Sequence, residues 1–118
     1  MNHAGTARLA VAIAAGVALA VAGCGRRWIP EATDADAARI SARWPGTTAT
    51  QLNHGRTLLL SRCGNCHLPP SPAELQAEAW SDEVREMRER SGLSVADAIL
   101  VERYLAAFAS DQPRGTGR

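Results

Sequence analysis

The sequence predicts a small all-α domain, and three observations support this class. Helix-capping patterns, a serine or threonine followed three residues later by an acidic residue, occur at Thr33/Asp36, Ser71/Glu74 and Ser94/Asp97. Apolar or small side chains recur at spacings of three and four residues along the chain, which places them on one face of a helix. Prolines and glycines separate these stretches and mark where each helix ends.

The first helix is expected directly after the capping pattern of Thr33 and Asp36. The stretch from there to Arg43 is rich in alanine, and Pro45-Gly46 closes it. We therefore predict a short amphipathic helix at this point of the chain.

A second helix is predicted to begin after Thr50 and to run to Cys63. Apolar or small residues spaced three and four apart lie along one face of it, at Leu52, Gly55, Leu58 and Leu59. The end of this helix presents Cys63 and the residues that follow.

The segment Leu68-Pro69-Pro70-Ser71-Pro72 cannot continue a helix, because proline lacks an amide donor and restricts the residue before it. Ser71 then matches an N-cap, Pro72 a first-turn proline and Glu74 the acid of a capping box. These three residues predict the start of a third helix.

Trp80, Val84 and Met87 form a single apolar stripe at positions i, i+4 and i+7. The stripe belongs either to the helix that starts at the proline segment or to a helix that restarts at Ser81. Gly92 breaks the pattern and is expected to end this helix.

The final helix is predicted from the capping pair Ser94 and Asp97 to about Ala109. Its apolar side is expected to contain Val95, Ile99, Tyr104, Leu105 and Phe108. Residues 111–118 are rich in glycine and proline, and we predict that this tail is disordered.

Residues 1–23 have the pattern of a signal peptide. Arg8 is their only basic residue, and the run from Leu9 to Ala22 has no charged or polar side chain and is short for a membrane span. The small residues Val21-Ala22-Gly23 before Cys24 look like a bacterial lipobox, in which the thiol is lipidated and the peptide is cut just before it. A plain signal peptide with an unrelated cysteine nearby is the alternative.

Lipidated Cys24 would be a membrane tether, because several acyl chains anchor a protein stably whereas one does so only marginally. Two arginines and Trp28 follow, a group that suits lipid headgroups but also an ordinary exposed linker. We predict that residues 24–50 are the lipidated cysteine and a linker with the short helix, and that residues 51–110 form the functional domain.

Size and charge limit the classes of function. Removal of the first 23 residues leaves 95 residues (118 minus 23), enough for one small domain. The chain has 13 basic residues, all arginine, and 12 acidic ones, so the loss of Arg8 leaves a formally neutral piece. Nothing in this balance indicates nucleic-acid binding. Tyr104 and Phe108 are the only Tyr and Phe, so a core built from protein alone would be thin.

The string Cys63-Gly64-Asn65-Cys66-His67 is a CxxCH motif, the pattern of covalent haem attachment. The thiols of Cys63 and Cys66 can add to the two vinyl groups of one haem, and His67 can bind its iron as the proximal ligand. A thioredoxin-like redox pair would need a strand-helix-strand setting, and a zinc site would need a second pair of ligands. Neither context is present in the sequence. We therefore expect one covalent haem c, whose apolar surface would also enlarge the thin core.

The second axial ligand decides between electron transfer and an open iron face that binds small molecules. Beyond residues 1–23, Met87 is the only methionine, and His54 is the only histidine besides His67. His54 lies nine residues before Cys63 on the same predicted helix, roughly 13 Å away along its axis, and cannot easily reach the distal face. Met87 follows the proline-rich turn and can cross to that face, although filling the core is the commoner role for such a methionine. We expect Met87 to be the distal iron ligand.

These residues resemble the small class I cytochromes c of bacteria. The shared pattern is Gly-Arg, CxxCH, Trp-x-x-x-Val-x-x-Met and Tyr-Leu, found here at Gly55-Arg56, Cys63 to His67, Trp80 to Met87 and Tyr104-Leu105. The resemblance covers about Trp44 to Ala109 and implies a cytochrome c-like helical domain wrapped around one haem. It further implies that Gly55, on the helix that leads to the CxxCH motif, packs against Tyr104 on the last helix. Leu59 departs from the pattern, since many relatives have an aromatic residue there.

The resemblance also implies the remaining site residues. The haem pocket would be lined by Leu68, Pro69, Trp80 and Val84. A carbonyl of the segment from Leu68 to Pro70 would accept the second ring hydrogen of His67, which would fix the orientation of the imidazole.

The sequence thus predicts an electron carrier and not an enzyme, since no catalytic acid, base or nucleophile is needed. We expect a single-haem cytochrome that is lipid-anchored through Cys24 in the bacterial cell envelope, faces the periplasm and passes electrons between redox partner proteins. A thioether ligand and a dry pocket both favour ferrous iron, so a positive reduction potential is expected. Two alternatives stay open: a haem sensor or ligand-binding protein in which Met87 does not hold the iron or is displaced, and the electron-accepting subunit of an oxidoreductase complex.

Overall fold

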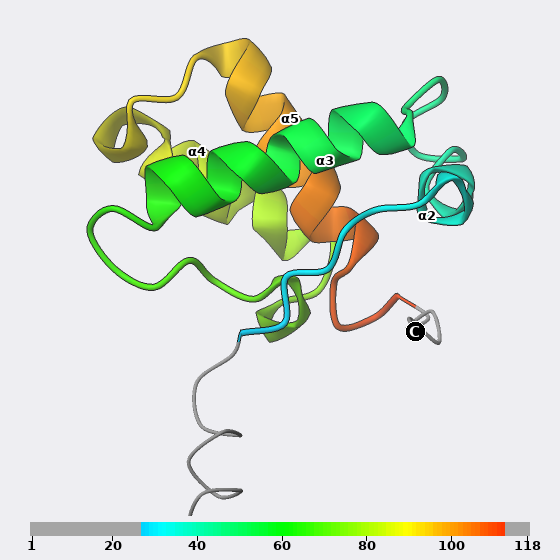
Figure 1. Cartoon of the computed structure of the whole chain (residues 1–118), viewed down its shortest axis with the longest axis horizontal. Helices are drawn as coiled ribbons and strands as arrows, with labels where there is room; N and C mark the ends of the chain where they lie inside the picture. Colours follow the sequence, from blue (N-terminus) through cyan, green and yellow to red (C-terminus); the bar gives the residue numbers. More distant parts are fainter. Residues whose placement is uncertain (1–26, 113–118) are drawn as a thin grey trace, which may run out of the picture.

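The computed structural model describes residues 27–112; the predicted signal peptide, Cys24 and residues 113–118 lie outside this range. All of its secondary structure is helical and no strand occurs within the described range, which confirms the predicted all-α class. The elements are α2 (Asp34–Arg39), α3 (Ala49–Leu58), η1 (Leu59–Cys63), η2 (Pro72–Glu74), α4 (Ala79–Ser91) and α5 (Val95–Ala107). Figure 1 shows α3 crossing in front of α5, with α4 on the far side.

The crossing of α3 and α5 is close because Gly55 has no side chain. A Cβ atom at Gly55 would lie 2.2 Å from the carbonyl oxygen of Leu100 and 3.1 Å from Cβ of Tyr104. Tyr104 is completely buried at this point. The predicted packing of Gly55 against Tyr104 is therefore present in the structure.

Gly55→Ala is expected to destabilise the fold by about 3 kcal/mol, because the new methyl group would meet the rigid backbone of Leu100. A glycine-to-alanine change inside a helix normally stabilises a protein by about 1 kcal/mol. A loss of stability here would therefore point to the close crossing of α3 and α5. Urea unfolding followed by circular dichroism measures it. His54→Ala, at the exposed neighbouring position of α3, is the matched control and should leave the midpoint almost unchanged. A midpoint that stays level or rises in Gly55→Ala would contradict the close crossing.

α2 begins at the predicted capping box. The Thr33 amide donates to Oδ2 of Asp36 over 2.8 Å, and the Asp36 amide donates to Oγ1 of Thr33 over 3.4 Å. The helix ends at Arg39, earlier than the predicted Arg43, and turns then lead to Gly46, whose φ of 78° lies in the left-handed region.

α3 begins at Ala49, before the predicted start after Thr50. Its N-cap is Thr48, which exchanges capping hydrogen bonds with Gln51. The helical path continues to Cys63 as predicted, but its last turn, η1, is a π-helix. Such wide turns are uncommon and are often found at functional sites. Here the π-helical turn sets the direction in which Cys63 leaves the helix.

The capping pattern at Ser71 begins only the short turn η2 and not a long helix. Ser71 and Glu74 do exchange capping hydrogen bonds, but Leu75 is extended (φ −128°, ψ 165°) and ends the turn. The Leu75 carbonyl accepts a hydrogen bond from the Ser110 amide over 2.9 Å, which holds the chain in this path. α4 is therefore a separate helix, as in the restart alternative, but it begins at Ala79 and not at Ser81. Its C-cap is Gly92, with a φ of 65°.

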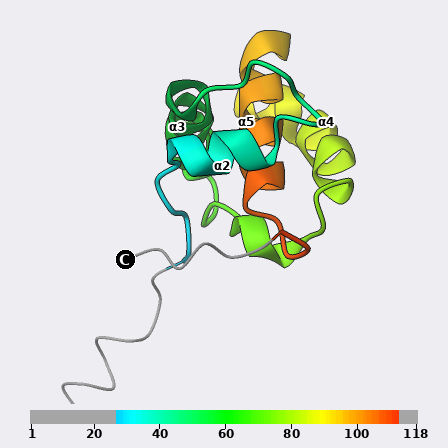
Figure 2. The same cartoon turned by 90° about the vertical axis from the view of Figure 1, so that its right-hand side faces the viewer.

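α5 begins at the predicted N-cap Ser94, but its predicted apolar side was partly wrong. Val95 and Ile99 are 62% and 41% exposed, because the N-terminal part of α5 extends above the other described helices (Figure 2). The buried positions are Ala98, Val101, Tyr104, Leu105 and Phe108.

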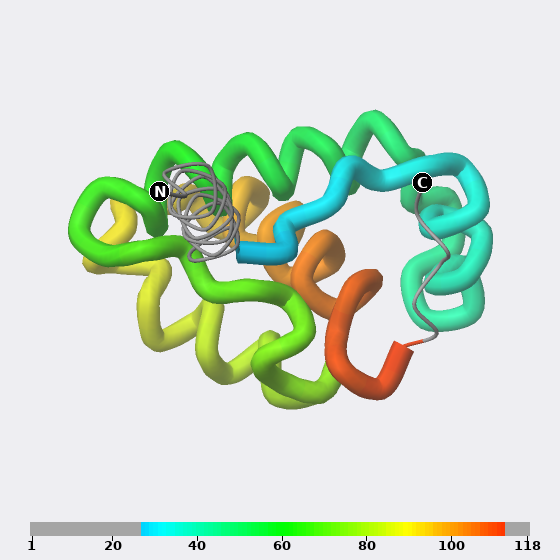
Figure 3. The backbone as a smooth tube through the Cα atoms, turned by 60° about the horizontal axis from the view of Figure 1, so that its bottom comes forward, coloured from blue at the N-terminus to red at the C-terminus, as the bar shows by residue number. Residues whose placement is uncertain are grey.

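Residues 27–33 form an extended segment, here named the strap, which lies along α3 (Figure 3). The side-chain amide of Asn53 binds the backbone of Ala32 at both polar groups: Ala32 N donates to Asn53 Oδ1 (2.8 Å), and Asn53 Nδ2 donates to Ala32 O (2.9 Å). The hydroxyl of Tyr104 donates to the carbonyl of Pro30 over 2.6 Å. The strap is therefore attached to both crossing helices.

The boundaries expected for the domain differ from those of the structure. Residues 27–50 are not a free linker, because they contribute side chains to the hydrophobic core, at Ala32, Ala37 and Ile40. At the other end, Asp111 accepts a hydrogen bond from the Ala77 amide over 3.0 Å, so the first residue of the predicted disordered tail is held in place. From residue 113 onward the tail lies outside the described range.

The core lies where α3, α4 and α5 meet, and its largest fully buried side chains are Leu52, Leu59, Pro72, Trp80, Val101, Tyr104 and Leu105. In the part of the chain that the structure describes, no helix is long and apolar enough to cross a membrane.

Candidate functional site

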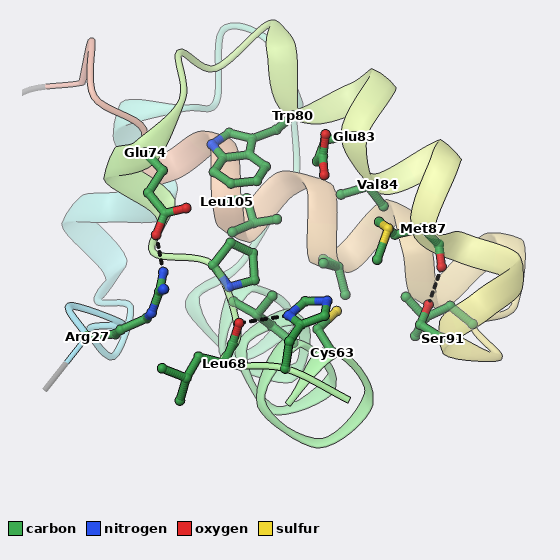
Figure 4. A pocket seen from close by; sticks show the side chains of 15 residues that line it. Arg27, Cys63, Leu68, Glu74, Trp80, Glu83, Val84, Met87, Ser91 and Leu105 are labelled. Carbon is green, nitrogen blue, oxygen red and sulfur yellow. Dashed lines mark hydrogen bonds and ion pairs between the residues drawn. The ribbon is translucent and has the colours of Figure 1, made fainter. Parts of the chain in front are cut away.

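A cavity opens between the end of α3, the proline segment and the inner sides of α4 and α5 (Figure 4). It has about 710 Å³ of empty space, including its open side. Its apolar walls are formed by Leu59, Trp80, Val84, Leu93, Val101 and Leu105. The cavity thus lies at the side of the hydrophobic core, directly beside the CxxCH motif.

The cavity brings together most of the residues that the sequence predicted for the site: Cys63, His67, Leu68, Trp80, Val84 and Met87 all line it. Cys66 and Pro69 are not part of the lining. Cys66 is exposed on the turn that follows Cys63, and Pro69 is half-buried in the proline segment.

The imidazole of His67 is oriented by the next residue in the chain. Its Nδ1 lies 2.8 Å from the carbonyl oxygen of Leu68. A carbonyl can only accept a hydrogen bond, so Nδ1 carries the hydrogen and donates it. The lone pair of the neutral ring is then on Nε2, the nitrogen that can bind a metal. This hydrogen bond is the one predicted for the segment from Leu68 to Pro70.

The two cysteine thiols differ in their surroundings. Cys63 is half-buried at the end of η1, and burial raises the pKa of its thiol, whereas Cys66 is exposed. Neither forms a disulfide. Gly64 allows the tight turn between them, because a Cβ atom there would lie 2.3 Å from the carbonyl oxygen of Leu60. The π-helical turn and this glycine together present both thiols at one end of α3.

Met87 approaches the cavity from the wall opposite the CxxCH motif. Figure 4 shows its sulfur directed toward the side of the cavity where Cys63 lies. Trp80, on the same side of α4, is only 1% exposed, and its indole N–H donates to the carbonyl of Pro72 over 3.0 Å. The predicted stripe is therefore the side of α4 that faces the cavity, and Met87 lines the cavity instead of filling the core.

The two candidate iron ligands, His67 and Met87, reach the cavity from different parts of the fold. His67 comes from the turn after η1 and Met87 from α4, while His54 is exposed on α3 and does not line the cavity. Within residues 27–112 there is no group of three or more His, Cys, Asp or Glu side chains that could hold a metal ion.

The charged residues of the cavity were not among those predicted from the sequence. Arg27, Glu74 and Glu83 line it, and Arg27 forms an ion pair with Glu74. We name the exposed part of the lining at Arg27, Leu68 and Glu74 the mouth of the cavity. No motif links Arg27 to the site, because it comes from the strap and is distant in sequence from the other lining residues.

No family model, curated protein or solved structure gives a significant match to this chain.

Proposed function

We propose that this protein is a single-haem c-type cytochrome that carries electrons one at a time and is held by lipid on Cys24 to a membrane of the bacterial cell envelope, facing the periplasm. The observation that carries the proposal is the CxxCH motif at the edge of an apolar cavity, with Met87 on the opposite wall. The partners are redox proteins that donate and accept single electrons.

The donor groups in and beside the cavity fit a covalent haem. Cys63 and Cys66 would hold the porphyrin through thioether bonds, since they are free thiols three positions apart at one end of a helix. Nε2 of His67 and the sulfur of Met87 would hold the iron. The apolar walls suit the faces of a porphyrin. When bound, the haem supplies reversible one-electron chemistry between ferric and ferrous iron.

The chain's own residues would set the preference between the two iron states. The Leu68 carbonyl accepts the hydrogen of His67 Nδ1, which fixes the ring and raises its basicity as a ligand. A methionine sulfur and an apolar lining favour the less charged, ferrous state, so we expect a positive reduction potential.

The charged side of α4 requires no substrate. Its side chains are exposed and pair with one another, as in the ion pair of 2.6 Å between Arg85 and Asp82 one turn apart. An electron carrier needs no catalytic acid, base or nucleophile, and none is assigned.

A haem sensor is the second candidate, because one specific observation favours it. Met87 is only partly buried, and the cavity has an open side. A small ligand such as carbon monoxide could then displace a weakly held sulfur from the iron.

Expression in a bacterial host that matures c-type cytochromes tests the proposal. We expect coloured protein whose haem stays attached during denaturing electrophoresis. The ferric form should show the weak far-red absorption band of sulfur-to-iron ligation, and the ferrous form should bind carbon monoxide poorly. Colourless protein would refute haem binding. Coloured protein that lacks the band and binds carbon monoxide readily would replace the carrier with the sensor.

A further inference from the structure

We infer that the strap holds the mouth of the cavity against the lipid surface, so that the domain has one fixed orientation on its membrane. The inference rests on the proposed lipid on Cys24 and goes beyond it, since a lipid on a free tether would let the domain turn in any direction. The attachment of the strap, its position at the mouth and the short chain to Cys24 support it.

The strap is attached along its whole length. The carbonyls of three consecutive strap residues accept hydrogen bonds from side chains of the domain: Ser71 Oγ to Trp28 O (3.0 Å), Arg56 Nε to Ile29 O (3.0 Å) and Tyr104 OH to Pro30 O (2.6 Å). Asn53 adds the paired hydrogen bonds to Ala32, and Glu74 the ion pair to Arg27. Because the partners belong to α3, to α5 and to the η2 turn, the strap cannot swing outward without breaking contacts with several elements.

The chain between the strap and the proposed lipid is short. Arg27 lines the cavity, and Cys24 lies three residues before it. Three extended residues span at most roughly 11 Å. The 13 residues of α5 alone span about 20 Å. A lipid on Cys24 is therefore restricted to the side of the domain at which the mouth lies.

The side chains at the mouth suit a lipid surface. Leu68 is 67% exposed there, and Trp28, next to Arg27 on the strap, is 40% exposed. An exposed apolar side chain and an indole ring interact well with the headgroup region, and the ion pair of Arg27 with Glu74 leaves the mouth without net charge. Figure 1 and Figure 2 show the first turn of α5 at the opposite end of the domain from the start of the strap.

Two single-cysteine variants of the haem-loaded, full-length protein test the orientation. Gln76→Cys places a thiol just after η2, at the strap end, and Ala96→Cys places one in the first turn of α5; both positions are exposed. In haem-loaded, lipidated protein the native thiols are all in thioethers, so a polyethylene-glycol maleimide reacts only with the new cysteine. Each variant is compared on vesicles of phosphatidylethanolamine and phosphatidylglycerol with the same variant exported behind a cleavable signal peptide and starting at Gly25, which has neither the acyl chains nor the apolar run of residues 9–22 and stays in water.

We expect the vesicles to slow the modification of Gln76→Cys several-fold and to leave the rate of Ala96→Cys almost unchanged. Equal slowing at both positions, or at neither, in protein that has the haem spectrum and enters the detergent phase on partitioning would overturn the fixed orientation and leave the proposed function intact. Coloured protein that stays in the aqueous phase would refute the lipid anchor, and the inference with it, but not the haem.

A longer tether provides the matched control for the role of the strap. A Gly/Ser insertion of about 15 residues between Gly25 and Arg26 adds a flexible reach of roughly 20 Å. The strap and the cavity are unchanged in this variant, so the haem spectrum should be too. Protection of Gln76→Cys should fall to the level of Ala96→Cys, and protection that persists despite the insertion would contradict orientation by the short tether.

Discussion

Replacing both Cys63 and Cys66 with alanine is expected to abolish covalent haem attachment and most of the folding of the domain. The two thiols would form both thioether bonds, so no covalent link is left. Without the porphyrin, the apolar wall formed by side chains such as Leu59, Trp80 and Val84 would be left without a packing partner. We expect the loss of at least about 4 kcal/mol of stability, comparable to the deletion of one large aromatic side chain from a protein core.

Haem-stained denaturing gels and thermal unfolding by circular dichroism measure the two parts of this effect. Cys24→Ser is the matched control, because it removes the third cysteine without touching the CxxCH motif, and it should retain the haem. Haem that stays on the double variant after denaturation would show that the motif is not the attachment site.

Met87→Ala is expected to open the distal side of the iron while leaving the haem attached. The loss of the sulfur ligand removes a preference for ferrous iron, and each tenfold loss of that preference lowers the reduction potential by about 59 mV. We expect a fall of at least this size in a potentiometric titration, together with ready binding of carbon monoxide by the ferrous form.

Glu86→Ala, at the exposed neighbouring position of α4, is the control for Met87→Ala, since it changes the helix but not the cavity. Its potential and spectrum should match those of the wild type. If the far-red sulfur band persists in Met87→Ala, another residue holds the iron.

The sequence predicted a helix correctly where its local capping and spacing pattern agrees with the tertiary contacts that the helix makes. Ser94 caps α5 as its sequence pattern indicates, and Gly55 lies where a close helix crossing requires it. The pattern at Ser71 was misleading, because a capping box specifies only the first turn of a helix. The hydrogen bond from the Ser110 amide to Leu75, which joins distant parts of the chain, then decides the path. No local pattern reveals such a contact.

The site residues that belong to a motif or to one face of a helix could be predicted from the sequence. Those that only tertiary contacts bring to the cavity could not. Trp80 and Met87 share one side of α4 in any helix that contains both, so their position on the cavity wall followed from their spacing. Arg27 reaches the cavity only because the strap is attached to α3 and α5, through contacts such as that of Asn53 with Ala32. An asparagine on a helix surface gives no sign of a partner 21 residues earlier.

The hydroxyl of Tyr104 that binds the Pro30 carbonyl also determines how the strap responds to alkali. Burial raises the pKa of this phenol well above its ordinary value near 10, and the opposing influence of the Arg56 cation is weaker. The folded state therefore favours the protonated phenol, and its stabilising contribution is complete below the unfolded pKa and is lost only as the pH rises through the raised folded value. The hydrogen bond between Tyr104 and the strap thus persists across neutral and mildly basic conditions, and strong base is needed before ionisation of this residue breaks it.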